Sequence, residues 1–212
     1  MIRLSRADKN SRGFTLVELL IVSAVLSLVL TSLCGIYLSV AAEWERQDGR
    51  GTALSVTSMA CSRVSDYLSQ AVGAVVLTRF EEGDAIAVNL PANSAHGIYV
   101  PVWNAGRIEH QSGNWIVFYL SDSSGDYRRT GDILWAATMN WSTYPNGVVP
   151  DSAWSLYQGQ SKGKISPISS LQFSVADDGL PLVTVTATSA YKVGDTNGRI
   201  KLTRSVCVQN AY

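Results

Sequence analysis

One carboxylate stands at the start of a long apolar run, where a charge has no ordinary partner. Glu18 directly precedes the stretch from Leu19 to Ala42, which carries no charge over about 24 positions. A carboxylate at membrane depth costs roughly 2.5–3.5 kcal/mol or more, so it indicates a function and needs a partner. A cut between Gly13 and Phe14 would create an amine on Phe14, one helical turn from Glu18. The simpler alternative is a helix that begins at Leu19 and leaves Glu18 among the lipid headgroups.

Catalytic chemistry is poorly represented in the rest of the chain. There are two histidines, His96 and His110, and each lies close to Gly or Ser in a predicted loop. Nucleophile elbows, phosphate-binding glycine loops and paired-cysteine metal spacings are absent from the sequence. The sequence therefore predicts a protein that is not an enzyme and uses no cofactor.

Two aspartates are weak candidates for calcium ligands. Asp122 and Asp126 flank Ser124 and offer alternating oxygens. A complete calcium loop supplies six to eight oxygens, usually with a bidentate Glu, and that Glu is missing here. Turn formation by aspartate explains the same residues, so no metal site is predicted.

The three cysteines allow one disulfide. Cys34 lies in the apolar run, where it acts as a small apolar residue, whereas Cys61 and Cys207 fall in the part that follows. In an exported domain these two could pair and tie the last strand to a helix, which would stabilise the fold by ~4–5 kcal/mol in the chain-entropy model. Two buried free thiols are the other interpretation, and the sequence leaves both open.

The apolar run itself predicts a transmembrane helix. At ~1.5 Å per residue it reaches about 36 Å, which is enough to cross a bilayer with some tilt. Before it, Arg3, Arg6, Lys9 and Arg12 oppose a single acid, and such positive charge keeps that end of the chain cytoplasmic. Cleavage by an ordinary signal peptidase near Ala41, or lipidation of Cys34, would also export the chain. The length of the run and the bulky Leu33 before Cys34 disfavour these two routes.

A second helix pattern follows the apolar run, up to about Val72. Apolar residues recur at helical spacing from Leu54 through Cys61, Val64 and Leu68 to Val72. Two glycines, Gly49 and Gly51, lie just before this pattern and predict a kink or a short break in the helix.

The remaining sequence reads as β-structure. Predicted strands cover 74–80, 85–90, 98–103, 114–120, 127–136, 165–175, 182–188 and 200–209. Near-continuous apolar character predicts that the 114–120 strand is covered on both faces, and alternation predicts that the 182–188 strand is covered on one.

The aromatic segment 139–160 is interpreted as a loop whose rings pack on the sheet or as a contact surface for neighbouring subunits. The absence of a basic stretch after residue 50 argues against nucleic-acid binding.

The residues from Arg12 to Val22, RGFTLVELLIV, resemble the class III signal of type IV pilins and type II secretion pseudopilins. The resemblance implies cleavage after Gly13 by a prepilin peptidase, N-methylation of Phe14 and an assembly role for Glu18. It also implies an α+β fold, in which a long helix continues out of the membrane and packs on an antiparallel β-rich domain. The hairpin layout near the C-terminus is similar to W-type minor pilins and J-type pseudopilins.

These observations predict a basic leader at 1–13, a transmembrane helix at 14–42, its amphipathic continuation at 43–72 and a β-rich extracytoplasmic domain at 73–212. The expected function is that of a minor pilin or pseudopilin subunit in the bacterial inner membrane, with its C-terminal domain in the periplasm. The expected partners are prepilin peptidase, other pilin subunits and inner-membrane lipid. The alternatives are a membrane-anchored adhesin or ligand-binding module that uses the same export route, and an anchored hydrolase.

Overall fold

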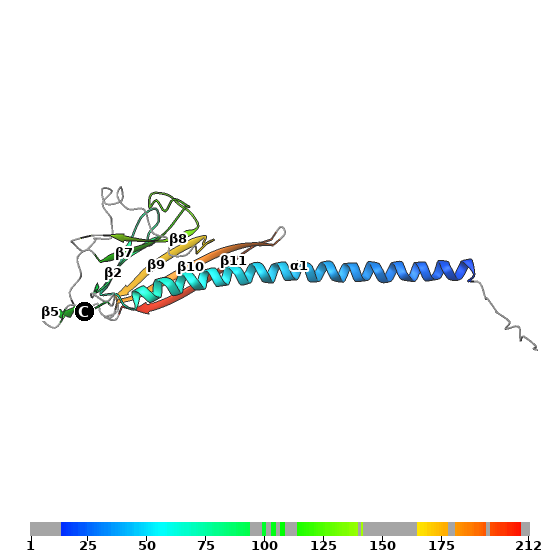
Figure 1. Cartoon of the computed structure of the whole chain (residues 1–212), viewed down its shortest axis with the longest axis horizontal. Helices are drawn as coiled ribbons and strands as arrows, with labels where there is room; N and C mark the ends of the chain where they lie inside the picture. The colour runs from blue at the N-terminus through cyan, green and yellow to red at the C-terminus, as the bar shows by residue number, and fades with distance from the viewer. Residues whose placement is uncertain are drawn as a thin grey trace, which may run out of the picture. The chain divides into compact units, whose positions relative to one another are not determined.

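A computed structural model of the chain describes residues 14–93, 99–100, 103–104, 107–108, 114–139, 141, 165–177, 181–193 and 196–208. The longest element is α1, Leu16–Leu68 (Figure 1). It is helical through Gly35, Gly49 and Gly51, so the break predicted at the glycine pair is not formed. The chain divides into two compact units, an anchor unit, Met1–Glu45, and a β unit, Arg46–Tyr212.

The anchor unit contains the apolar part of α1. This helix is long and apolar enough to cross a membrane, and no other helix among the described residues meets that test. Its large apolar side chains are exposed, from Leu16 at 80% to Val40 at 44%. Five hydroxyl groups interrupt the apolar surface, and each donates to a carbonyl of its own helix: Ser23, Ser27, Thr31, Ser32 and Ser39. Because these donors are satisfied internally, the helix surface presents little unpaired polarity to lipid.

The β unit holds two antiparallel sheets. The first has the order β1-β2-β7-β8, formed by Gly73–Leu77, Ala85–Asn89, Trp115–Ser121 and Ile133–Met139. The second has the order β11-β10-β9, formed by Thr196–Cys207, Pro181–Val193 and Ser170–Asp177. Two short pairs complete the described strands: β3 (Ala92–Asn93) with β4 (Tyr99–Val100), and β5 (Trp103–Asn104) with β6 (Arg107–Ile108). The predicted α+β class with antiparallel sheets is confirmed.

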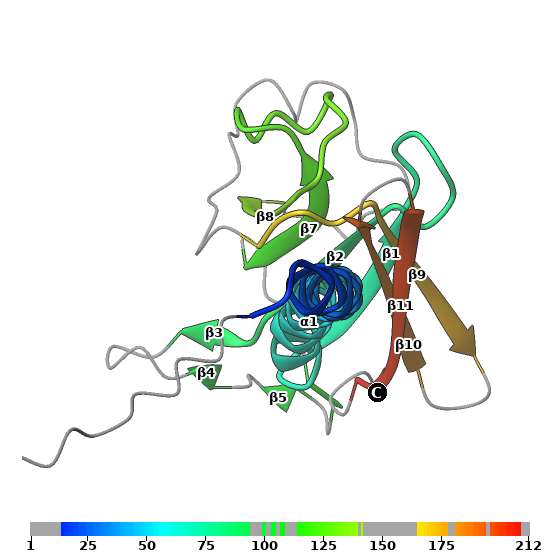
Figure 2. The ribbon, with the colours of Figure 1, turned by 90° about the vertical axis from the view of Figure 1, so that its right-hand side faces the viewer.

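The second half of α1 packs against both sheets, and Figure 2 shows it end-on between them. Its buried residues Ala60, Cys61, Val64 and Leu68 share a core with Phe118 of β7 and Val185 of β10. At the start of the second helical pattern, the buried face of α1 differs from the predicted one. Ala53 and Thr57 are buried there, whereas Leu54, which was predicted to lie on the apolar face, is 48% exposed. The helix ends at Leu68, four residues before the predicted end of the pattern.

The central strand β7 is buried on both faces, as its apolar run predicted. Phe118 and Leu120 face the core shared with α1. Trp115, Val117 and Tyr119 lie in a second apolar cluster with Tyr127 and Met139. The prediction for β10 is also confirmed, since Val183, Val185 and Ala187 are buried and the intervening threonines are partly exposed.

Several strand boundaries differ from the predicted ones. β8 begins at Ile133 and β9 at Ser170, later than the sequence pattern indicated. β10 continues to Val193 and β11 begins at Thr196, so most of the stretch 189–199, which separates two predicted strands, belongs to one long hairpin with pairing from Leu182–Cys207 to Val193–Thr196. Side-chain alternation continues through these polar residues, but their low hydrophobicity concealed the strand.

Candidate functional site

The candidate site lies where α1 begins. Thr15 precedes the first helical residue, and Glu18 lies in the first turn. The Glu18 carboxylate oxygen Oε2 accepts hydrogen bonds from the backbone N–H and from the hydroxyl of Thr15, both at 3.1 Å. In return, the backbone N–H of Glu18 donates to the Thr15 hydroxyl at 3.2 Å. The two side chains therefore form a reciprocal helix cap, an arrangement that stabilises a helix start by about 1 kcal/mol.

This cap decides where the helix begins, which the sequence had left open. The helix begins at Leu16, not at Leu19, so Glu18 belongs to the helix and its carboxylate points back toward Phe14. A negative group at this position is also favoured by the helix dipole. The second carboxylate oxygen, Oε1, has no partner among the described residues, which leaves it able to accept a further donor. Phe14 itself is 78% exposed.

Thr15 was not singled out from the sequence. A threonine followed three positions later by a glutamate, directly before an apolar run, is a local signature of this cap. That signal was present in Thr15-Leu16-Val17-Glu18 and would have placed the helix start correctly.

Two aromatic residues mark the other end of the apolar run. Tyr37 and Trp44 are 72% and 71% exposed on α1. Such amphipathic rings are enriched at membrane–water interfaces, and their position agrees with an apolar span that ends near Ala42.

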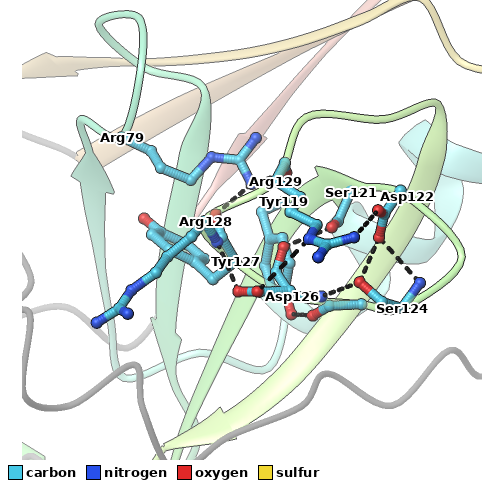
Figure 3. Close-up of polar contacts among 10 residues, drawn as sticks. Arg79, Tyr119, Ser121, Asp122, Ser124, Asp126, Tyr127, Arg128 and Arg129 are labelled. Atoms are coloured by element: carbon cyan, nitrogen blue, oxygen red, sulfur yellow. Dashed lines mark hydrogen bonds and ion pairs between the residues drawn. The ribbon is translucent and has the colours of Figure 1, made fainter.

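The two calcium candidates are engaged by protein groups (Figure 3). Asp122 accepts from the backbone N–H of Ser124 at 2.9 Å and from the Ser124 hydroxyl, and its other oxygen lies 3.2 Å from the Arg129 guanidinium. Asp126 accepts from the backbone N–H of Arg128 and lies 3.9 Å from Arg129. The hydrogen bonds from Ser124, followed by the Arg129 charge, lower the pKa of Asp122. Among the described residues no group of three or more His, Cys, Asp and Glu side chains could hold a metal ion.

The side chain of Arg79 joins the loop between β7 and β8 to the β1–β2 turn, and the sequence gave no signal for this contact. The side chain of Arg79 is only 7% exposed, and its guanidinium lies 3.4 Å from Asp84, while another of its nitrogens donates to the Tyr127 carbonyl at 3.0 Å. It also stacks over the rings of Phe80 and Tyr127, at 4.5 and 5.0 Å from their centroids. Burial raises the pKa of the Tyr127 phenol, so its ring stays neutral beside this charge. The contacts link residues almost 50 positions apart, and they make this group a structural clamp.

In the structure both Cys61 and Cys207 are free thiols, and Cys61 is buried whereas Cys207 is only partly buried. Cys61 is buried beneath β11, and its sulfur lies 3.8 Å from the Leu202 carbonyl oxygen. Cys207 lies five residues further along β11, which corresponds to about 16 Å of strand. A disulfide needs Cα atoms within about 7 Å, so this register keeps the two cysteines apart. Burial raises the pKa of the Cys61 thiol, which makes it a weak nucleophile.

Several predicted residues lie outside the part of the chain that the structure describes. These are the cleavage residue Gly13, both histidines, and the aromatic segment 139–160 except for Met139 and Trp141.

Comparison with family models finds the prokaryotic N-terminal methylation motif at residues 8–33. This match includes Gly13, Phe14, Thr15 and Glu18. Comparison with curated proteins and with solved structures finds no match. The match covers the start of α1 described above, and it points to a structural subunit processed by prepilin peptidase, with one inner-membrane helix. The chain thus carries, at the capped start of its apolar helix, the motif that is the hallmark of type IV pilin-like proteins.

Proposed function

We propose that this chain is a minor subunit of a type IV pilus or of a type II secretion pseudopilus, and that it acts in filament assembly or in priming the filament tip. Prepilin peptidase cuts after Gly13 and methylates the new amine of Phe14. Residues 14–42 cross the inner membrane, 43–68 continue as an amphipathic helix, and 73–212 form the periplasmic β-rich domain.

The observation that carries this proposal is the position of the Glu18 carboxylate. Its Oε2 is held by Thr15 at the very start of the helix, and its Oε1 is open to another donor. A lone charge in the hydrocarbon region is costly, and an oppositely charged partner compensates for it. In the proposed mechanism, Glu18 of one subunit pairs with the Phe14 amine of a neighbour, so that two costly charges leave the bilayer as one pair.

The membrane orientation follows from the basic residues of the leader, Arg3, Arg6, Lys9 and Arg12. They keep the N-terminus cytoplasmic and place the chain after Trp44 in the periplasm. The exposed apolar surface of α1 then exchanges lipid contacts for contacts with other subunit helices when the filament forms.

The test is the Glu18→Ala variant in a host that assembles the filament, compared with Glu82→Ala, which removes an exposed carboxylate from the β1–β2 turn. We expect Glu18→Ala to insert into the membrane normally but to enter filaments at least about tenfold less well. Without Glu18 the Phe14 amine of the neighbouring subunit has no partner, and a loss of about 1.4 kcal/mol in pairing free energy already gives a factor of ten. Glu82→Ala should be incorporated like the unmodified chain. Quantitative immunoblots of membranes and of sheared filaments measure both quantities.

Full incorporation of Glu18→Ala would remove Glu18 from the mechanism. The mass of the mature N-terminal peptide tests the processing step separately. A peptide that begins with methylated Phe14 is expected, and one that begins near Ala41 or at a lipidated Cys34 would contradict the proposal.

A further inference from the structure

The sheet β9–β10–β11 has one face turned away from the core, which we call the outer face. Its position follows from the register: Thr184 lies opposite Ser205 and Thr186 opposite Thr203, and both pairs are joined by hydroxyl hydrogen bonds of 2.9 and 3.2 Å. The residues between them in β10, such as Val185, point into the core instead. The outer face is therefore hydroxylated and accessible to solvent.

The same register gathers three cations at the hairpin end of the outer face. Lys201 lies opposite Thr188, Arg199 opposite Ala190, and Lys192 opposite Asn197. Because paired residues of antiparallel strands share a face, Lys192, Arg199 and Lys201 project on the same side as the hydroxyl ladder. All three are exposed.

Within the described part of the chain, none of the three outer-face cations makes an ion pair or hydrogen bond. The described residues of the outer face carry no carboxylate, and Asp195 of the connecting loop lies outside them. Among its described residues, the outer face thus presents a positive end, although the whole chain has a formal net charge of zero.

This positive end lies at the start of the β unit. The Cys61 sulfur contacts the Leu202 carbonyl, and from Leu202 to Thr196 the strand extends about 20 Å, the length of about 13 helical residues. Figure 1 shows the hairpin running beside α1, away from the Leu68 end. The hairpin end therefore reaches the first turns of the β unit, which begins at Arg46, and only Glu43, Trp44 and Glu45 separate that residue from the apolar run.

We propose that the outer face of the β10–β11 hairpin binds anionic phospholipid headgroups at the surface of the membrane that holds α1. This inference rests on the proposed membrane-anchored function. Phosphate groups match the three cations in charge and the threonine and serine hydroxyls in hydrogen bonding. A membrane is favoured over a nucleic acid because the cations are few, the described outer face has no aromatic side chain for base stacking, and only three residues of the sequence separate the start of the β unit from the apolar run.

The test uses the full chain in nanodiscs made of phosphatidylcholine and phosphatidylglycerol in equal parts. A photoreactive p-benzoyl-phenylalanine in place of Ala190, between the cations, reports which lipid lies against the outer face. Each basic residue near an anionic surface gives a preference of about fivefold. We therefore expect adducts of phosphatidylglycerol to exceed those of phosphatidylcholine by at least about fivefold, and the excess to disappear in roughly 1 M salt, where the screening length is about 3 Å.

Matched variants isolate the charge. Lys192→Gln combined with Lys201→Gln should lower the ratio of the two adducts at least about fivefold and leave only the preference that Arg199 supplies, whereas Lys192→Arg with Lys201→Arg should keep the ratio. Arg63→Gln with Arg204→Gln removes two cations from other surfaces of the β unit and should also keep it. The photoreactive residue in place of Gln70, at the other end of α1 in the β unit, should give few lipid adducts. Far-UV circular dichroism checks that each variant is folded.

An unchanged ratio in the Lys192→Gln, Lys201→Gln variant would overturn the inference. So would a cross-link that moves from lipid to an added DNA duplex, which would identify a nucleic acid as the ligand. Failure of the chain to enter nanodiscs at all would contradict the proposed function as well. Normal insertion without a lipid preference would contradict this inference alone.

Discussion

Thr15 and Glu18 cap the start of α1 reciprocally, each accepting a hydrogen bond from the backbone N–H of the other. The cap holds one carboxylate oxygen beside the residue that follows Phe14. In the proposed assembly mechanism, the carboxylate is therefore oriented before a second subunit arrives, which reduces the entropy lost on pairing.

The first prediction concerns this orientation. Thr15→Val keeps the shape of the side chain but removes the hydroxyl, so we expect Glu18 to lose its fixed rotamer and filament incorporation to fall about threefold to tenfold, in line with a cap of about 1 kcal/mol. Thr15→Ser should retain incorporation. Thr31→Val is the control, because its hydroxyl donates only to the Ser27 carbonyl of the same helix. Equal losses for Thr15→Val and Thr31→Val would show that helix propensity, not the cap, is responsible.

The second prediction compares two glycines. Gly83 has a φ of 75° in the β1–β2 turn, and a Cβ there would meet the carbonyl oxygen of Phe173 in β9. We expect Gly83→Ala to lower the free energy of unfolding by about 2 kcal/mol or more. Gly51, in α1, has open space around it, and Gly51→Ala should raise that free energy by about 0.5–1 kcal/mol. Urea denaturation in detergent measures both, and a neutral Gly83→Ala would contradict the close approach of the turn to β9.

The third prediction concerns the Arg79 clamp. Arg79→Met would leave Asp84, which is 14% exposed, without its cation and would free the Tyr127 carbonyl. Removing one partner of a buried ion pair is strongly destabilising, and we expect a loss of about 2–4 kcal/mol in the free energy of unfolding. Arg204→Met, at an exposed position of β11, should change it by no more than about 0.5 kcal/mol. Similar effects of the two variants would exclude a clamping role for Arg79.

The fourth prediction tests the thiols. In the folded protein, a thiol reagent should modify the half-buried Cys207 faster than the buried Cys61, whose pKa is raised by burial. After unfolding without reductant, both peptides should be fully alkylated. Recovery of a Cys61–Cys207 disulfide peptide by mass spectrometry would mean that the strand register around Leu202 is different.

The fifth prediction concerns pH. Hydrogen bonds from Ser124, together with Arg129, lower the pKa of Asp122 in the folded state. Its contribution to stability is therefore present above the ordinary aspartate pKa of about 4 and is lost as the pH falls through the lower folded value. The difference in Tm between the unmodified chain and Asp122→Asn should be seen at neutral pH and should vanish in acid. Asp66→Asn, which alters an exposed carboxylate of α1 with no cation partner among the described residues, should show no such dependence.

The sequence by itself determined the features that depend on neighbouring residues. The apolar run from Leu19 to Ala42 is long enough to define a membrane helix, the motif around Phe14 and Glu18 is contiguous, and the alternation in β10 defines its buried face. Each of these signals lies within a few helical turns or one strand. The Thr15 cap has the same local character, although it was recognised only in the structure.

Only the tertiary structure decided what depends on residues far apart in the chain. Arg79 meets Tyr127 across almost 50 positions, and Cys61 meets Leu202 rather than Cys207. The outer-face cations alternate with other residues along two strands, so they form no basic stretch in the sequence. Their meeting requires the register of β10 with β11, which is set by the burial of Val183, Val185 and Ala187 against α1.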